Sequence, residues 1–402
     1  MPKHILIISQ YFHPETFRIN DIAQEWIKRG YRISVLTGIP NYPEGKFFPG
    51  YSFFRKRKEK WGDIEITRIP LTPRGHSAVG MVLNYYSFVI SGWFWNRFTR
   101  QKADIVFSFE TSPMTQLKIG CGYAKKHKVP HIMYVQDLWP ENVEVAGGIH
   151  NKRILGYLDR MVDKIYQQAD KILLTSPSFR ESVMHRKKPV PPEKLVYWPQ
   201  YAEDFYRPLP KKSIPEIPDD GMFNIVFTGN LGTAQGLDVL PRTARLLADE
   251  AVRFIIVGDG RYRESLEKEI EQLDVRQKFL MIPRQPAERI PEILSACDAG
   301  FISFAQNPLW EKTIPAKLQS YLACGKAVIA SASGETKRII EEAKCGIVTE
   351  TGNAEALAEG VRSMLSADLK RMGECARKYF EAHFDKKLLM DRMDHLIKEM
   401  AP

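Results

Sequence analysis

Short, almost uniformly apolar runs recur along the chain, and a loop and a helical pattern follow most of them. In the first half these runs cover residues 5–9, 32–37, 104–110, 130–136 and 171–176. Strands that are apolar on both faces are typical of a parallel sheet with helices packed on each side. Because parallel neighbours are joined by right-handed crossovers, the pattern predicts a doubly wound α/β domain.

A second series of the same kind begins at Phe223. Residues 223–240 have the pattern of a strand, a glycine-rich loop and a helix. Further strands are predicted at 253–257, 298–304 and 327–330. The second half of the chain therefore repeats the doubly wound pattern of the first.

The proline-dense segment 196–221 lies between the two series and is typical of an interdomain linker. The 402 residues are enough for two domains with full cores. We predict an N-terminal domain at 1–205 and a C-terminal domain at 206–384, with a last helix at 385–402 that packs back on the first domain.

The charge balance favours an anionic partner. The formal net charge is +10, which suits a nucleotide diphosphate, an acidic lipid or a nucleic acid. The five cysteines are scattered and never stand in CxxC spacing, which argues for a reducing cytosol and against a zinc site. The start MPKHILIISQ has the pattern of a first strand rather than of a signal peptide.

The stretch LWEKTIPAKLQSYLACGKAVIAS (309–331) has the pattern of a loop, a helix and a buried strand. We predict that Thr313 caps the helix and that Pro315 lies in its first turn. The start of a helix offers free N–H groups and a positive dipole end, where a diphosphate can bind. Lys312 and Lys317 add full positive charge there, although an ordinary strand–helix connection has the same spacing.

Two further loops carry candidate functional groups. Gly229 and Gly232 follow a predicted strand and let a backbone approach a ligand closely. Asp137 follows another strand in the motif DLWPE, where it can accept a proton from a hydroxyl group, with Glu141 as the alternative base. The structural alternative for Asp137 is a helix cap. The first strand is not followed by GxGxxG, which argues against a nicotinamide or flavin site.

Two segments of the N-terminal half fit contact with a membrane surface. Residues 78–95 form the most apolar stretch of the chain, with basic residues after it. Its length and its polar interruptions argue against a transmembrane helix and favour an interfacial one, with a core helix as the alternative. The basic run 52–61 with flanking aromatic residues supports membrane contact, and a solvated turn is the alternative.

An ordered set of motifs resembles glycosyltransferase family 4: SQYFHPE, RGYRISVLTGIPNYPEG, DIVFSFETSP, DLWPE, TGNLGTAQGLDVL, VGDG and IPAKLQSYLACGKAVIAS. Within the family, PNYPEG, DLWPE and GNLGTAQG resemble the WbuB-type L-fucosamine transferases of O-antigen and capsule assembly. The resemblance implies the GT-B fold, in which two doubly wound, Rossmann-like domains face each other across a cleft that closes over the donor.

The resemblance also implies an activity. Members of the family transfer a sugar, with retention of configuration, from a nucleoside diphosphate that is usually UDP, and they need no metal cofactor. No two aspartates stand two positions apart in this chain, so the metal-binding DxD motif of the other major glycosyltransferase fold is missing. The expected acceptor is a polyprenyl-diphosphate-linked saccharide at the cytoplasmic face of the plasma membrane, where the enzyme would associate peripherally with anionic lipid.

The resemblance carries roles over to individual residues. It implies catalytic roles for Asp137 and Glu311. It implies donor or diphosphate contacts from Gly229, Asn230, Leu231, Gly232, Gln235, Lys312, Pro315, Ala316 and Lys317. The expected acceptor region holds Glu15, Asn41, Tyr42 and Glu141. The chain departs from the family at two places: Gln319 or Ser320 stands where a second Glu is common, and Asn230 and Gln235 replace an Arg and a Lys.

Two other functions remain open from the sequence. A UDP-GlcNAc 2-epimerase-like enzyme can share the GT-B fold, but the motifs DLWPE and PNYPEG belong to the transferase subgroup. A non-catalytic basic protein that binds nucleic acid is compatible with the net charge. The sequence contains no helix-turn-helix, RRM or zinc-finger pattern that would support it, and we expect no nucleic acid partner.

Overall fold

The computed structural model describes residues 2–75, 77–145 and 147–401, and the chain forms two compact units. The first unit consists of Met1–Thr175, Phe179–Trp198 and Met393–Pro402. The second consists of Ser176–Ser178 and Pro199–Arg392. The first unit is therefore assembled from three separate segments, and its last segment comes from the end of the chain.

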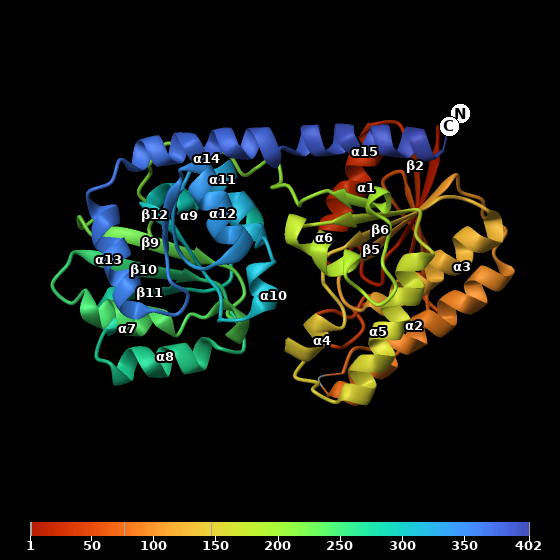
Figure 1. Cartoon of the computed structure of the whole chain (residues 1–402), viewed down its shortest axis with the longest axis horizontal. Coiled ribbons are helices and arrows are strands. Elements are labelled where there is room, and N and C mark those ends of the chain that lie inside the picture. The colour runs from red at the N-terminus through yellow and green to blue at the C-terminus, as the bar shows by residue number, and fades with distance from the viewer. Residues whose placement is uncertain (1, 76, 146, 402) are drawn as a thin grey trace. The chain divides into compact units, whose positions relative to one another are not determined.

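The first unit is built on an eight-stranded sheet with the order β3-β4-β2-β1-β5-β6-β7-β8 (Figure 1). All of its pairs are parallel except β3 with β4. The central strands are fully buried because both faces are covered by helices. The strands are β1 (His4–Ile8), β2 (Arg32–Gly38), β3 (Lys58–Trp61), β4 (Ile64–Ile69), β5 (Ile105–Glu110), β6 (His131–Val135), β7 (Lys171–Leu174) and β8 (Leu195–Tyr197).

Helices of the first unit connect these strands. They are α1 (Arg18–Lys28), α2 (Ala78–Phe98), α3 (Leu117–His127), α4 (Glu141–Val145), α5 (Lys152–Gln167) and α6 (Pro177–Met184). Helix α15 (Lys386–Met400) contributes its second half to this unit. Asp394 of that half accepts a hydrogen bond and ion pair from Arg29 in the α1 C-cap at 2.8 Å.

The second unit has a six-stranded, all-parallel sheet with the order β11-β10-β9-β12-β13-β14. Its strands are β9 (Phe223–Thr228), β10 (Val252–Val257), β11 (Phe279–Ile282), β12 (Ala299–Ser303), β13 (Ala327–Ser331) and β14 (Gly346–Thr349). Its helices are α7 (Val239–Leu246), α8 (Arg263–Gln272), α9 (Ile290–Ala296), α10 (Pro308–Glu311), α11 (Ala316–Ala323), α12 (Gly334–Ala343), α13 (Ala354–Leu365) and α14 (Leu369–His383).

Two doubly wound parallel sheets confirm the predicted fold class. Most strands begin and end within one or two residues of the predicted limits, because the apolar runs coincide with the buried strands. In each sheet the strand order reverses at the first strand, so that later strands are added on its other side: β1 lies between β2 and β5, and β9 lies between β10 and β12. Ligands of open α/β sheets bind at the carboxyl ends of strands beside such a switch point.

The structure corrects two local predictions. The β3–β4 hairpin was not predicted, because its polar and charged residues resemble a solvated basic run. Thr313 was predicted to cap α11, and this is wrong. Helix α11 begins at Ala316 behind Pro315, which is extended with ψ 135° and lies before the first turn rather than in it. The Thr313 hydroxyl instead donates to the Leu309 carbonyl at 3.0 Å, at the end of α10.

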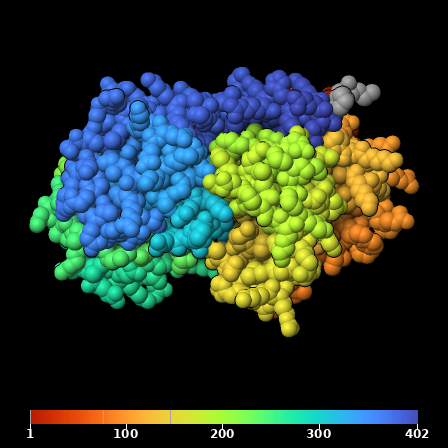
Figure 2. All heavy atoms as spheres, viewed as in Figure 1, coloured from red at the N-terminus to blue at the C-terminus, as the bar shows by residue number. Residues whose placement is uncertain are grey.

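The segment 78–95 lies in α2, which extends to Phe98. The structure excludes the core-helix alternative, because seven large apolar side chains of α2, six of them within 78–95, are exposed. Within the described residues, no helix is both long and apolar enough to cross a bilayer. The yellow and orange surface in Figure 2 belongs to the segment of the chain that contains α2, α3 and α5.

Candidate active site

Asp137 lies in the loop that follows β6, at the carboxyl edge of the first sheet. Burial raises the pKa of its carboxyl group above the usual range, while hydrogen bonds from Ser112 lower it. The charge of Asp137 also acts on the Tyr85 hydroxyl, whose pKa is raised by burial and lowered by Arg74. The first unit therefore gathers a carboxylate, a phenol and a guanidinium at one edge of its sheet.

Ser112 fixes the orientation of the Asp137 carboxylate. Its hydroxyl accepts N–H bonds from the Trp139 ring at 3.0 Å and from the Asn142 amide at 3.3 Å. It donates its one proton to Asp137 Oδ2 at 2.8 Å. Because two N–H groups occupy the lone pairs of the Ser112 oxygen, its hydroxyl proton can point only to Asp137 Oδ2. The other carboxylate oxygen of Asp137, Oδ1, therefore remains available to a substrate.

Glu110, the last residue of β5, binds the backbone of the loop that carries Asp137. Its Oε2 accepts the backbone N–H groups of Gln136 and Asp137, both at 3.1 Å. The side chain is fully buried, and burial together with the nearby Asp137 charge raises the pKa of Glu110 well above the usual range. Buried oxygens of Glu110, Tyr166 and Glu141 have no hydrogen-bond partner among the described residues. The predicted alternative base Glu141 thus has one carboxylate oxygen turned into the protein.

Three of the residues predicted for the acceptor region form one clamp. Glu15 is buried, and its Oε1 accepts the N–H groups of Asn41 at 2.8 Å and of Tyr42 at 2.7 Å. Burial raises the pKa of Glu15 to about 7, and these N–H bonds oppose the shift. The Asn41 side chain accepts the Arg74 N–H at 2.8 Å. Glu15 and Asn41 therefore hold the loop after β2 and leave Tyr42 at the surface.

Arg74 completes this part of the edge. It lies in the loop after β4, donates to the Tyr11 hydroxyl at 3.3 Å and lies over the Tyr42 ring at 5.3 Å. Tyr11, Phe17 and Tyr42 have ring centroids 5.2–5.4 Å apart. Four residues of this edge were not predicted from the sequence: Arg74, Tyr85, Ser112 and Glu110. Glu110 ends β5, Ser112 and Arg74 lie in loops that follow strands, and Tyr85 lies in α2, so their place in the chain relative to a strand or helix is the signal that points to them.

Arg186 holds the loop that carries Asp137 from the other side. Its guanidinium donates to the Trp139 carbonyl at 3.1 Å, to Asp163 at 2.7 Å and to Asp159 at 2.6 Å. Arg186 and Asp163 are almost fully buried. A buried guanidinium with two carboxylates and a carbonyl fixes the loop geometry, and removal of the cation leaves buried charge unpaired.

We expect Arg186→Met to lower the free energy of unfolding of the first unit by about 3 kcal/mol, because Asp163 then stays buried without its cation. Urea denaturation followed by tryptophan fluorescence measures this. The matched control is Arg32→Met, which removes an exposed pair with Glu65 of the same unit and should cost less than about 0.5 kcal/mol. Equal losses in the two variants would show that the Arg186 network adds nothing to stability.

The second unit brings the predicted diphosphate residues together at the carboxyl ends of β9 and β12. Gly229 follows β9 with φ 138°, and Gly236 with φ 57° packs so closely on Phe304 that a Cβ would lie 2.6 Å from its backbone. The Ser303 hydroxyl donates to the Gln235 carbonyl at 2.5 Å. This contact joins the glycine-rich loop to β12. Gly229 needs glycine for its backbone conformation, and Gly236 needs it for both conformation and space.

Lys317 lies at the centre of this group. Its Nζ donates to Gln235 Oε1 and lies 4.0 Å from the centroid of the Phe227 ring. A Cβ at Gly229 would lie 3.8 Å from Lys317 Cε, so the glycine borders the ammonium group. Burial lowers the pKa of Lys317 to about 7. A cation whose described neighbours are an amide oxygen and a ring lacks a counter-charge, which an anionic ligand would supply.

The backbone of the glycine-rich loop is mostly engaged already. The N–H groups of Gly229, Leu231 and Gly232 donate to the carbonyls of Val257, Asp259 and Asn230 at 2.9–3.1 Å. The first N–H groups of α11, at Ala316 and Lys317, have no acceptor within their helix by geometry. At this edge, therefore, the groups left available to an anion are the Lys317 ammonium and the first N–H groups of α11, and not the engaged N–H groups of the loop.

The remaining predicted donor residues border this edge. Glu311 ends α10 and is exposed, and its carbonyl would lie 2.0 Å from a Cβ at Gly334, at the start of α12. Lys312 is partly exposed beside it. Gln319 and Ser320 are buried in α11, and the Ser320 hydroxyl donates to the Ala316 carbonyl at 3.2 Å. Neither side chain therefore replaces the carboxylate of the second Glu that is common in glycosyltransferase family 4.

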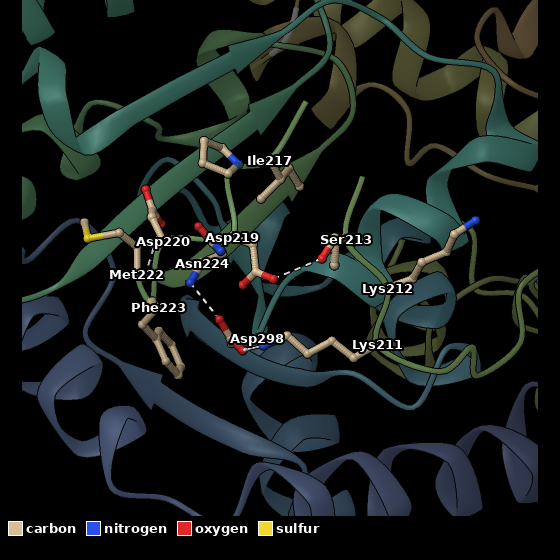
Figure 3. Close-up of a pocket in the computed structure, with 13 residues that line it drawn as sticks. Lys211, Lys212, Ser213, Ile217, Asp219, Asp220, Met222, Phe223, Asn224 and Asp298 are labelled. Carbon is tan, nitrogen blue, oxygen red and sulfur yellow. Dashed lines mark hydrogen bonds and ion pairs between the residues drawn. The ribbon is translucent and has the colours of Figure 1, made fainter. Parts of the chain in front are cut away.

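A separate pocket of about 500 Å³ lies at the opposite, amino edge of the second sheet (Figure 3). Asp298 accepts the Asn224 N–H and the Lys211 ammonium, both at 2.8 Å, and Ser213 donates to Asp219 at 3.1 Å. These bonds fasten the segment before β9 to the sheet. The pocket holds none of the predicted site residues, and its charged groups already have partners in the pocket or next to it.

Two family models match the chain, one in each half. The model described as "Glycosyl transferase 4-like domain" matches residues 16–200, and "Glycosyl transferases group 1" matches residues 211–379. The chain is 24% identical over 404 residues to WcaI of Escherichia coli (strain K12), whose assignment as a colanic acid biosynthesis glycosyl transferase is provisional. That alignment covers 95% of this chain and 96% of WcaI.

Solved structures share the fold along almost the whole chain. Sucrose-phosphate synthase from Thermosynechococcus elongatus aligns with a TM-score of 0.75 at 14% identity, over 99% of this chain and 98% of its own. Anabaena Alr3699/HepE in complex with UDP and glucose aligns with a TM-score of 0.70 at 15% identity, over 99% and 100%. These likenesses confirm the predicted GT-B fold.

Proposed function

Since the chain belongs to the glycosyltransferases, with a 4-like domain followed by a group 1 domain, we propose that it transfers a sugar from a UDP-sugar to a lipid-linked saccharide in surface polysaccharide synthesis. The observation that carries the proposal is the partly buried Lys317 at the carboxyl edge of the second sheet. Anabaena Alr3699/HepE, which shares the fold, binds UDP and UDP-glucose. WcaI supports a role in polysaccharide synthesis.

We assign the donor to the second unit. Lys317 and the first N–H groups of α11 would meet the diphosphate, with Gly229, Asn230, Leu231, Gly232 and Gln235 shaping the loop beside it. Lys312, Pro315 and Ala316 border the same helix start, and Glu311 would face the donor sugar. In this proposal cationic side chains and helix dipoles offset the charge of the leaving diphosphate, and no metal cofactor takes part.

We assign the acceptor to the first unit. Asp137 Oδ1 would orient the acceptor hydroxyl, and the raised pKa of Asp137 favours its taking up the proton. In a transfer with retention, the hydroxyl attacks on the face that the diphosphate leaves, so a donor phosphate oxygen can share the proton. Tyr42 and Arg74 would border the acceptor, while Glu15 and Asn41 hold their loop and Glu141 supports the loop of Asp137.

The finer substrate classes rest on the motif order. PNYPEG, DLWPE and GNLGTAQG favour the WbuB-type subgroup, so we propose an N-acetylated hexose, with 6-deoxy sugars included, as the donor sugar. The acceptor would be a saccharide on a polyprenyl diphosphate. Such an acceptor lies at the cytoplasmic face of a membrane, and the enzyme would reach it as a peripheral protein.

The test is a panel of UDP-sugars with synthetic lipid-diphosphate saccharides, analysed by mass spectrometry with EDTA present. We expect a glycosylated acceptor whose mass rises by one sugar residue, and UDP as the second product. An isomerised donor without any acceptor would show an epimerase instead. Complete loss of transfer in EDTA that added Mg²⁺ or Mn²⁺ restores would overturn the metal-independent mechanism.

We expect the affinity for UDP to fall as the pH rises from about 7 to 9. The pKa of Lys317 is about 7 in the free protein, so above that pH the group must gain a proton before it can pair with the diphosphate. The dissociation constant should rise by about tenfold per pH unit, measured by titration calorimetry. The control is Lys317→Arg, which stays charged throughout and should bind with little dependence on pH in this range.

A further inference from the structure

Helix α2 is attached to the first unit through one narrow face, which carries two asparagines, a phenylalanine and a glycine. Its buried positions are Asn84, Phe88, Gly92 and Asn96, which recur every four residues and therefore line one face. The Asn84 amide donates to the Thr72 carbonyl at 2.6 Å, and the Asn96 amide donates to the Ile119 carbonyl at 2.8 Å. A Cβ at Gly92 would lie 2.3 Å from the Ile119 side chain, so the helix packs closely there.

The outer face of α2 is apolar instead of polar. Seven large apolar side chains on it are between 50% and 75% exposed: Val79, Val82, Leu83, Ile90, Trp93, Phe94 and Phe98. An amphipathic surface helix normally turns such residues toward the core. A contiguous exposed apolar patch of this kind marks a surface that another apolar phase covers.

A basic groove of about 400 Å³ lies beside this face, between α3 and α5. Lys118, Arg160 and Lys164 line it together with Tyr157 and Met161. The three helices meet at one point, because the Tyr86 hydroxyl of α2 lies 3.2 Å from the Tyr157 hydroxyl of α5, and the Lys118 ammonium lies 5.8 Å from the Tyr86 ring. Figure 1 shows α2, α3 and α5 side by side.

The charges of these helices leave the groove cationic. Helices α2 and α3 contain no Asp or Glu. The two acidic residues of α5, Asp159 and Asp163, both bond to Arg186, and Lys187 lies 3.9 Å from Asp159. No ion pair engages Lys118, Arg160 or Lys164 among the described residues. The groove therefore offers three cations to a negatively charged group at the border of an apolar surface.

We propose that the α3–α5 groove binds the phosphate headgroup of an anionic phospholipid while the outer face of α2 lies among the lipid chains. A bilayer surface presents anionic phosphate directly beside apolar chains, which matches the order of basic groove and apolar helix face. Trp93 and the paired tyrosines would lie at the headgroup level. This inference deepens the proposed function by naming the lipid class that holds the enzyme at the membrane. It rests on the proposed function only for the reason to be at a membrane, which is the lipid-linked acceptor.

The test measures binding of the full-length protein to vesicles of phosphatidylcholine with and without one quarter phosphatidylglycerol. We expect about 100-fold stronger binding to the anionic vesicles. The triple variant Lys118→Gln, Arg160→Gln, Lys164→Gln should lose this preference, at about fivefold for each charge. The matched control Lys268→Gln, Lys337→Gln, Lys370→Gln carries the same net charge and should change binding less than twofold. Equal losses in the two triple variants would overturn the groove as the headgroup site.

Two further measurements test the helix face and keep the test independent of folding in the variants. Trp93→Gln with Phe94→Gln should weaken binding to both kinds of vesicle about tenfold or more. In the unaltered protein, lipids brominated near the headgroup should quench tryptophan fluorescence on vesicle addition. Absence of quenching, with no binding to either vesicle, would overturn the proposal. Transfer to a water-soluble acceptor should persist in the triple variant, so failure of lipid binding and failure of the proposed transferase activity are distinguishable.

Discussion

Replacement of Lys317 by Met should weaken UDP binding by about 100-fold, which corresponds to about 2.7 kcal/mol. The side chain keeps its length and its packing on Phe227, but the diphosphate loses a partly buried cation that interacts at low effective dielectric. Titration calorimetry with UDP and with UMP separates the charge effect, because the loss should be larger for the diphosphate.

Lys326→Met is the matched control for this substitution. Lys326 lies just before β13 at the opposite edge of the same sheet, and burial lowers its pKa as well. Its ammonium donates to the Cys297 carbonyl at 2.6 Å, far along the chain from the glycine-rich loop. Both variants lose a partly buried lysine, and UDP affinity should change in Lys317→Met alone. Unchanged affinity in Lys317→Met would remove this residue from the donor site.

Replacement of Asp137 by Asn should lower kcat by about 10³-fold and leave the affinity for UDP unchanged. Asn has the same shape and can still accept the hydrogen bond from Ser112, so the loop should keep its conformation. What is lost is the charge and the ability to take a proton, which contributes about 10² to 10⁴ in proton-transfer catalysis. Steady-state kinetics with the identified donor, together with UDP titration, give both quantities.

Asp170→Asn is the control for Asp137→Asn, because Asp170 directly precedes β7 and lies at the opposite, amino edge of the same sheet. It accepts the His131 N–H at 2.8 Å at the amino edge of β6, away from the carboxyl-edge loops. Its substitution should leave kcat within about twofold. Full activity in Asp137→Asn would end the catalytic assignment, and Glu141→Gln would then be the next variant to measure.

The fold could be predicted because its strands are buried on both faces. A continuous run of buried residues such as Ile105–Glu110 is too short for a core helix and too apolar for a loop, and the spacing between runs leaves room for one helix each. The β3–β4 hairpin was missed for the converse reason: β3 is an edge strand with charged and half-exposed residues, and its pattern equals that of a solvated loop. An edge strand without fully buried residues leaves no apolar run by which it can be recognised in a single sequence.

The candidate site was only partly predictable. Asp137 and the glycine-rich loop could be placed at carboxyl edges of the sheets because each directly follows a strand, and Lys317 because it lies at the start of a helix. Ser112 and Arg186 could not, since they act on the Asp137 loop from 25 and 47 residues away along the chain, and a serine or an arginine in a loop has no local signature. Glu15 was predicted for the acceptor region, and the sequence did not indicate that its buried carboxylate accepts the backbone N–H groups of Asn41 and Tyr42.

The discontinuous first unit has a consequence for the order in which the protein folds on the ribosome. Arg29 and its partner Asp394 are separated by 365 residues of sequence. At roughly 5–20 residues per second, translation reaches Asp394 roughly 20 to 70 s after Arg29. During that interval the nascent N-terminal sheet lacks its last helical segment, so chaperone binding to that uncovered face would be confined to chains still being synthesised.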